Sequence, residues 1–301
     1  MPKISKVKGR QIFDSRGNPT VEAEVFSDNG LSATAIVPSG ASTGTYEAYE
    51  LRDKSNKKYL GKSVFKAIEN INGTISNNLN NFEILNQKKI DKNLIDIDGT
   101  NQKTKLGANS ILATSIAVSK LGAKCKKTSL YKYLGGENVC YLPIPLMNII
   151  NGGVHANNSL RIQEFMIRPE NAKTFTEAIR MCFIVIQNLK NLIDSKNLPT
   201  TVGDEGGFAP TLNKNEEAIE FILKSIEKSG FKPGEDISIC LDVAANELFK
   251  DGMYSIKSEK FEKTEIVIDY YLNLIKKYPI KSIEDPLSED DWSSWTKLTQ
   301  L

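Results

Sequence analysis

Residues 237–243 read Ile237-Ser-Ile-Cys-Leu-Asp-Val243, and residues 280–284 read Ile280-Lys-Ser-Ile-Glu284. Both are short apolar runs of strand length that carry a carboxylate at or next to their end. Between them, residues 264–278 have apolar side chains at helical spacing, and Pro279 ends this predicted helix. A strand, a helix and a second strand in this order predict two neighbouring parallel strands, as in an α/β barrel.

Asp242 and Glu284 are the carboxylates at these two strand ends. In a barrel of parallel strands such residues lie at the rim where catalytic groups collect. Neighbouring strands are only about 4.8 Å apart, so the two carboxylates can share one cation. Each residue alone also fits a helix N-cap after its strand, and it is the pair that predicts a metal site. Oxygen ligands favour Mg²⁺, Mn²⁺ or Ca²⁺.

The composition is that of a soluble globular protein of one large domain or two ordinary ones. The chain has 301 residues, 40% hydrophobic and 25% charged, and its 39 basic and 37 acidic residues give a net charge of +2. This balance argues against nucleic-acid binding. Neither a signal peptide nor a membrane span is visible, and the cysteines form no Cys-x-x-Cys pair. We therefore expect a cytoplasmic protein with reduced thiols.

His155 is the only histidine, which excludes a His-rich zinc site. It lies in the glycine-rich segment Asn151-Gly-Gly-Val-His-Ala-Asn157, between two predicted strands. A flexible segment argues against a histidine of the core. Two interpretations stay open: a lid that handles protons or hydrogen bonds, and an ordinary surface loop.

Three further polar motifs have both a functional and an ordinary interpretation. Gln163-Glu164 falls in the apolar strand predicted for residues 162–167, where a carboxylate must be paired, bound to metal or shifted in pKa. Asp204-Glu205-Gly-Gly is either an acidic turn or a site where glycines allow close approach. Ser42 lies in a glycine-serine loop that lacks the ending of a P-loop but can close over a polar ligand.

The first part of the chain has a different pattern. Apolar residues alternate over residues 21–25 and 31–37, on either side of the turn Asp28-Asn-Gly30, and predict an antiparallel meander. Helical periodicity follows, with Leu106, Ile111, Leu112, Ser115, Ile116 and Leu121 expected on one buried face. Gly135-Gly-Glu-Asn138 is a plausible boundary. We expect an α+β domain over residues 1–138 and a barrel over residues 139–301.

Six motifs together give the chain a specific resemblance, which covers residues 3 to about 295. They are Asp14-Ser-Arg-Gly-Asn-Pro-Thr20, Pro38-Ser-Gly-Ala-Ser-Thr-Gly44, Asn148-Ile-Ile-Asn-Gly-Gly153, Gln163-Glu-Phe-Met166, Gly203-Asp-Glu-Gly-Gly207 and Ser282-Ile-Glu-Asp285. In this order they resemble the enolase family. The resemblance implies an α+β N-terminal domain followed by an α/β TIM-like barrel with a ββαα start. It also implies Mg²⁺-dependent reversible dehydration of 2-phosphoglycerate to phosphoenolpyruvate, in glycolysis and gluconeogenesis.

The resemblance also assigns roles to residues of this chain. Asp242 and Glu284 would be two of the three protein ligands of the structural Mg²⁺, and Ser42 would close over the substrate and help hold a second Mg²⁺. Glu205, with Glu164 beside it, would help expel the hydroxyl group as water. Gln163 and His155 would border the substrate. A homodimer or larger homo-oligomer is implied, with Asp14-Ser15-Arg16 near the interface.

The chain departs from this family at its end. The resemblance implies about another third of chain, with the third metal ligand, the base lysine and the phosphate-binding Arg-Ser pair; no residue here takes those roles. The barrel is therefore expected to be incomplete at the C-terminus, with an exposed apolar face and an unpaired edge, and the 301 residues alone to be inactive. The resemblance could also extend to other enzymes of the wider superfamily, such as mandelate-racemase-like or muconate-lactonising-like members. Those enzymes place a Lys-x-Lys pair where this chain has Gln163-Glu164, which argues against them. A non-catalytic binding protein, at a surface or in a complex, is the alternative from another class.

Overall fold

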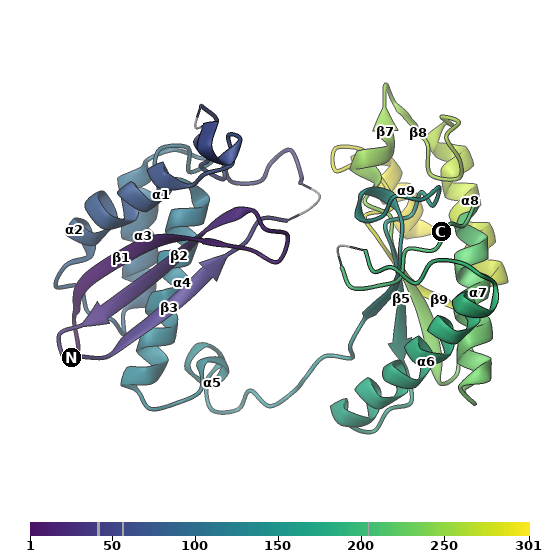
Figure 1. Ribbon diagram of the computed structural model, residues 1–301, viewed down its shortest axis with the longest axis horizontal. Helices are drawn as coiled ribbons and strands as arrows, with labels where there is room; N and C mark the ends of the chain where they lie inside the picture. Colours follow the sequence, from purple (N-terminus) through teal and green to yellow (C-terminus); the bar gives the residue numbers. More distant parts are fainter. Residues whose placement is uncertain (41–42, 56, 204) are drawn as a thin grey trace. The chain divides into compact units, whose positions relative to one another are not determined.

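A computed structural model describes residues 1–40, 43–55, 57–203 and 205–301 of the chain. The chain divides into two compact units, Met1–Tyr141 and Leu142–Leu301 (Figure 1). Each unit has its own hydrophobic core. In the described residues no helix is both long and apolar enough to cross a membrane.

The first unit is a three-stranded antiparallel sheet covered by helices. Its strands pair in the order β1-β2-β3, with bounds Ile4–Phe13, Pro19–Ser27 and Ser32–Val37. The meander predicted for β2 and β3 is confirmed, and Gly30 has the positive φ of 84° that the turn requires. The helices are η1 (Lys57–Tyr59), α1 (Phe65–Asn70), the π-helix η2 (Ile71–Ile75), α2 (Ser76–Leu79), α3 (Gln87–Asp98), α4 (Ala108–Cys125) and α5 (Leu130–Gly135).

Helix α4 packs on β2 and β3 through a face that the sequence analysis predicted only in part. Its fully buried positions include Ala113, Ala117 and Leu121, whereas Leu112 is 48% exposed. The prediction was right for Leu121 and wrong for Leu112, and it missed Ala113 and Ala117, because small side chains let a helix approach a sheet closely but give a weak hydrophobic signal.

The second unit contains a four-stranded sheet in the order β4-β5-β6-β9. The pairs β4·β5 and β5·β6 are antiparallel, and β6·β9 is parallel. The strands and the small β7·β8 hairpin span Met147–Asn151, Glu164–Pro169, Ile237–Asp242, Phe249–Lys250, Met253–Tyr254 and Ile280–Glu284. The helices are η3 (Gly153–His155), α6 (Phe175–Ser195), α7 (Asn215–Lys228), η4 (Ala245–Leu248), α8 (Thr264–Lys277) and α9 (Trp292–Gln300).

Strand β5 is antiparallel to both of its neighbours, which agrees with the ββαα start that the family resemblance implies. Two helices, α6 and α7, lie between β5 and β6. A pair of antiparallel helices returns the chain to the edge of the sheet where β5 ended, so β6 runs opposite to β5. Glu164 is consequently the first residue of its strand, not an interior one, and it lies at the edge where β6 and β9 end.

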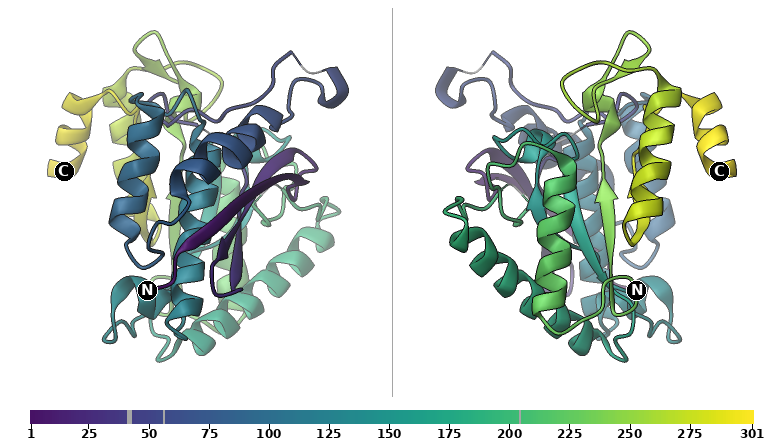
Figure 2. Two further views of the ribbon diagram at one scale, coloured as in Figure 1. Left: turned by 90° about the vertical axis from the view of Figure 1, so that its left-hand side faces the viewer. Right: turned by 90° about the vertical axis from the view of Figure 1, so that its right-hand side faces the viewer.

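The two faces of this sheet differ in chemistry. Phe165, Ile167, Ile239 and Leu241 belong to the core that includes residues of α6, α7 and α8, which lie along one face (Figures 1 and 2). The register places the other residues of β5, β6 and β9 on the opposite face: Glu164, Met166, Arg168, Ser238, Cys240, Asp242, Ser282 and Glu284. Most of the side chains on this second face are polar.

Candidate active site

Three carboxylates lie side by side at one edge of the sheet of the second unit. Glu164 is the register partner of Asp242, and Asp242 is the register partner of Glu284. Backbone hydrogen bonds continue past the strand ends: Gln163 N donates to the Asp242 carbonyl oxygen and Val243 N to that of Glu284, both at 3.0 Å. The sequence prediction that Asp242 and Glu284 end neighbouring parallel strands is confirmed.

The chain turns sharply after each of the two parallel strands. Ala244 has φ 47° and Asp285 has φ 43°, in the left-handed region that side chains other than glycine rarely adopt. The Ala244 amide donates to Asp242 Oδ1 at 3.0 Å, so the turn fixes one oxygen of that carboxylate. Ala245 N donates to the Asp285 carbonyl oxygen at 3.0 Å, which connects the two turns.

His155 and Gln163 lie next to the carboxylates. His155 is only 6% exposed, and its Nδ1 is 3.4 Å from Glu164 Oε1. This buried position contradicts an ordinary surface loop, and the role of His155 in handling protons or hydrogen bonds stays a prediction. Gly152 N and Gly153 N donate to the Gln163 and Leu160 carbonyl oxygens and hold the loop down. Gln163 is 3% exposed, and its Nε2 lies 3.4 Å from Asp242 Oδ2.

Burial and mutual repulsion raise the pKa of all three carboxyl groups. The pKa of Glu164 rises to about 7, first because it is buried and then because Asp242, Glu205 and Glu284 are negatively charged. Burial also raises the pKa of Asp242 and of Glu284, with repulsion from Asp285 added in both cases. A group of acids that disfavours its own ionisation is poised to accept a cation or to hold a proton.

Glu205 is exposed on a tight loop, and its charge acts on Glu164. The Gly203 amide donates to the Gly207 carbonyl oxygen at 2.8 Å and closes the loop. Asp204 lies outside the described residues. Sequence reasoning missed the buried Asn151, whose Nδ2 donates to the same Gly207 oxygen at 2.8 Å. A polar residue at the end of an apolar strand was the available signal.

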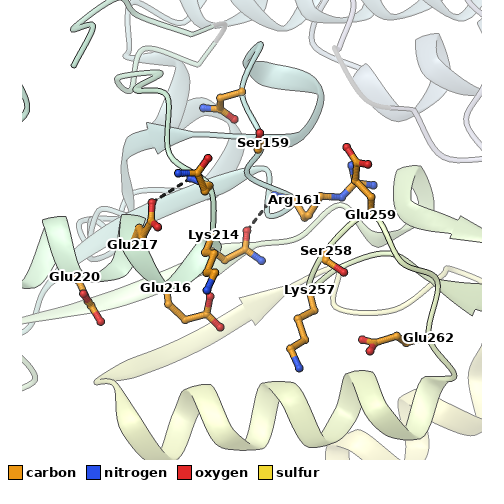
Figure 3. Close-up of a pocket in the computed structure, with 13 residues that line it drawn as sticks. Ser159, Arg161, Lys214, Glu216, Glu217, Glu220, Lys257, Ser258, Glu259 and Glu262 are labelled. Atoms are coloured by element: carbon orange, nitrogen blue, oxygen red, sulfur yellow. Dashed lines mark hydrogen bonds between the residues drawn. The ribbon is translucent and has the colours of Figure 1, made fainter. Parts of the chain in front are cut away.

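A groove of about 890 Å³ lies beside the segment that leads into Gln163 (Figure 3). Its lining has charges of both signs, with Arg161, Glu216 and Glu262 among the residues labelled there. Asn215 accepts hydrogen bonds from the Arg161 and Ile162 amides at 3.0 and 3.2 Å. This buried asparagine therefore fixes the backbone just before Gln163 and Glu164.

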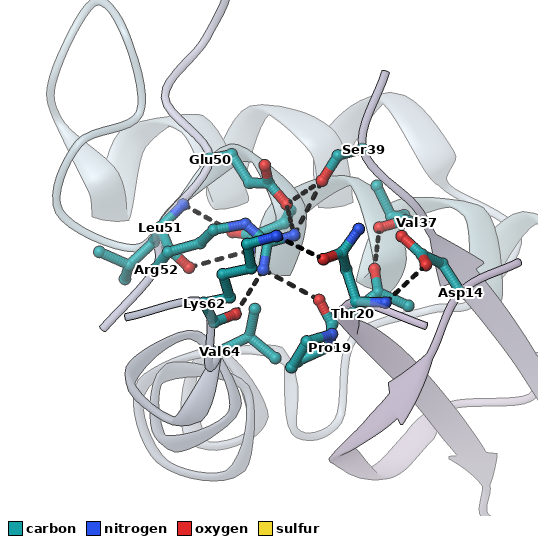
Figure 4. Close-up of polar contacts among 12 residues, drawn as sticks. Asp14, Pro19, Thr20, Val37, Ser39, Glu50, Leu51, Arg52, Lys62 and Val64 are labelled. Atoms are coloured by element: carbon teal, nitrogen blue, oxygen red, sulfur yellow. Dashed lines mark hydrogen bonds and ion pairs between the residues drawn. The ribbon is translucent and has the colours of Figure 1, made fainter. Parts of the chain in front are cut away.

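Ser42, the remaining predicted site residue, lies outside the described residues. The base of its loop is held within the first unit by a polar cluster (Figure 4). The Ser39 hydroxyl donates to Glu50 Oε1 at 2.6 Å, and an Arg52 nitrogen donates to the Ser39 hydroxyl at 2.8 Å. Arg52 also donates to the Pro19 carbonyl oxygen at 3.0 Å. The cluster ties residue 39 to residues 50 and 52, on either side of the segment that contains Ser42.

The acidic edge fits a hard cation in its chemistry. Asp242 and Glu284 offer carboxylate oxygens from neighbouring strands, which is the donor type that Mg²⁺ prefers. Among the described residues, no group of three or more His, Cys, Asp or Glu side chains could hold a metal ion. That Asp242 and Glu284 bind Mg²⁺ therefore stays a prediction.

Comparison with known proteins gives a consistent result over both units. Residues 4–134 match the family described as "Enolase, N-terminal domain", and residues 139–301 match "Enolase, C-terminal TIM barrel domain". The enolase of Pelagibacter ubique (strain HTCC1062) is 61% identical over 298 residues, which are 99% of this chain and 71% of that enolase.

Proposed function

Because the chain belongs to the enolase family, whose members are lyases, we propose that it carries the acidic part of a site for Mg²⁺-dependent dehydration of 2-phosphoglycerate to phosphoenolpyruvate. The observation that carries this proposal is the row Glu164, Asp242 and Glu284 across three paired strands. The raised pKa of each carboxyl group supports it.

In this proposal Asp242 and Glu284 bind the structural Mg²⁺. The metal, when bound, supplies positive charge that neutralises negative charge on substrate oxygens. Ser42, from the glycine-serine loop, would help to hold a second Mg²⁺. Gln163, whose amide group is held against Asp242, would orient the substrate together with the buried His155.

Glu205 and Glu164 would handle the proton that accompanies the departing hydroxyl group. A carboxyl group with a pKa of about 7, as at Glu164, retains a proton in a large share of molecules at neutral pH. Glu205 is exposed on its loop and close enough for its charge to raise the pKa of Glu164. Glu164 can therefore hold the proton that leaves with the hydroxyl group as water, with the Glu205 carboxylate nearby.

The base lysine that the family resemblance implies has no counterpart among these 301 residues. We therefore propose that this chain by itself does not turn over 2-phosphoglycerate. A homo-oligomer and a cytoplasmic location are further proposals. The four unpaired cysteines support a reducing compartment. In the described residues no observation favours the alternative of a non-catalytic binding protein.

The test compares this chain with a chain joined to the barrel segment that follows in the Pelagibacter ubique enolase. We expect phosphoenolpyruvate formation, followed by its ultraviolet absorbance, only for the joined chain and only with Mg²⁺. Glu205→Gln in the joined chain should lower kcat at least about 100-fold, whereas the exposed Glu227→Gln should not. Full turnover by the 301-residue chain, or an active Glu205→Gln variant, would contradict the proposal.

A further inference from the structure

The end of β4 contains a buried amide that is connected to two loops beside the acidic edge. Asn151 is the last residue of β4 and is 0% exposed. Its Nδ2 donates to the Gly207 carbonyl oxygen at 2.8 Å, and its Oδ1 accepts from Asn148 Nδ2. Both functional groups of this side chain are therefore satisfied inside the protein, as a buried amide requires.

The backbone of Asn151 makes two more connections. Its amide donates to the Phe208 carbonyl oxygen at 2.8 Å, directly after the Glu205 loop. Its carbonyl oxygen accepts from Asn158 Nδ2 at 3.0 Å, on the far side of the His155 loop. One residue thus contacts both the loop that carries Glu205 and the loop that carries His155.

The packing around Asn151 leaves no room for a side chain at Gly203 or Gly207. A Cβ atom at Gly203 would lie 2.4 Å from Asn151 Nδ2 and 2.7 Å from the His155 carbonyl oxygen. A Cβ atom at Gly207 would lie 2.8 Å from the Ile149 carbonyl carbon. The glycines on both sides of Glu205 therefore let its loop lie directly on the Asn151 amide and the His155 backbone.

We propose that Asn151 is a positioning residue. It fixes where the Glu205 loop lies relative to His155 and to the start of β5. Asn151 contacts backbone atoms of both loops and would affect catalysis only by positioning Glu205. The expected effect on catalysis rests on the proposed function, whereas the positioning of the loop does not. A displacement of about 1 Å at a catalytic group can lower a rate about 100-fold, so a positioning role should be visible in kcat.

The first arm of the test is hydrogen exchange on the 301-residue chain. Asn151→Asp keeps the shape of the side chain but places an oxygen against the Gly207 carbonyl oxygen, where the two repel. We expect exchange of the Gly203 and Phe208 amides to accelerate at least tenfold, with exchange in α6 and β6 unchanged. The matched control is Asn188→Asp, which changes a half-buried side-chain amide of α6. It should leave the Glu205 loop unaffected. Uniform acceleration, or none, would overturn the proposal.

The second arm measures kinetics in the joined chain described above. Asn151→Asp should lower kcat roughly 100-fold, with KM for 2-phosphoglycerate changed less than about threefold. Unchanged kcat despite a loosened loop would overturn the catalytic part. If the joined parent chain is itself inactive, the proposed function is in question, and the exchange arm still decides whether Asn151 positions the loop.

Discussion

Ala244 is a residue whose backbone conformation works against its side chain. Its φ of 47° lies in the left-handed region, which costs a residue with a Cβ atom roughly 1 kcal/mol relative to glycine. Ala244→Gly should therefore raise the free energy of unfolding by about 0.5–1 kcal/mol, even though glycine is usually the less stable choice. Urea unfolding at constant pH measures this difference.

Ala245, the next residue, provides the control. It is 0% exposed and has no positive φ, so glycine there should lower the free energy of unfolding by about 1 kcal/mol. If the two variants are equally destabilised, the turn after Asp242 holds no backbone strain. Ala244 lies two residues after Asp242, a proposed metal ligand. Backbone strain is commonly retained at such functional sites.

The raised pKa of Glu164 determines how the stability of the metal-free protein should depend on pH. Its pKa is about 7 in the folded chain against an ordinary value of 4.5, so the folded state keeps a proton that the unfolded state releases. Stability should be greatest below pH 4.5 as far as this group is concerned, and should fall as the pH rises to about 7. The loss is on the order of 2–3 kcal/mol.

Glu164→Gln tests this expectation, because glutamine cannot ionise. Urea unfolding in the presence of a chelator at pH 5 and pH 8 should show a larger loss for the parent chain than for the variant. Asp242 and Glu284 titrate in the same direction and remain in both proteins. Parallel pH profiles for the two proteins would show that Glu164 ionises normally.

At the scale of elements, the free edge of β1 is covered by side chains in place of another strand. Gly9 N donates to Asn72 Oδ1 at 2.9 Å, and Val7 N donates to Ser76 Oγ at 3.1 Å. These amides point away from β2 and would otherwise be open to pairing with another chain. The segment η2–α2 is thus positioned to protect the edge of the sheet.

Asn72→Ala should lower the free energy of unfolding by about 1 kcal/mol and increase aggregation on heating, because the Gly9 amide loses its partner. Asn78→Ala is the matched control, since this exposed side chain of α2 donates to the Thr74 carbonyl oxygen in the adjoining η2. Thermal unfolding and light scattering of both variants provide the measurement. Equal behaviour would mean that Asn72 does not protect the edge.

The sequence predicted the elements whose pattern is strong and local. The strand at residues 280–284 and the meander of β2 and β3 are confirmed. Part of the buried face of α4 was missed because it includes small residues such as Ala113 and Ala117. The direction of β5 could not be read from its own residues, because it follows from the number of helices before β6. Strand β1 lacks regular alternation, since charged residues share it with Gly9 and Gln11.

The site was predicted where a strand end carries a carboxylate, as at Asp242 and Glu284. The burial of His155 was not, because it depends on a loop folding back onto β5 through Gly152 and Gly153. Asn151 and Asn215 were missed because their partners are backbone atoms far away in sequence. Side chains that bind a ligand leave a local motif, whereas side chains that position a loop leave almost none.

At the scale of the whole molecule, the two hydrophobic cores share no residue among those described. The first unit buries its core between its own sheet and its own helices, and its edge strand β1 is covered. We therefore expect residues 1–141 to fold alone and to unfold in one cooperative transition. In the second unit, β9 pairs on one side only within the described residues, so residues 142–301 should aggregate more readily.

Calorimetry and two-dimensional NMR of the two segments distinguish these expectations. The segment 1–141 should give dispersed amide signals and one calorimetric transition, whose enthalpy agrees with the two-state value. Broad, collapsed signals from this segment would show that its core depends on the second unit. Its Arg52 cluster should survive in isolation, because all of its partners lie within residues 19–62. Retention of that cluster would mean that the loop containing Ser42 is anchored by the first unit alone, before any metal or substrate binds.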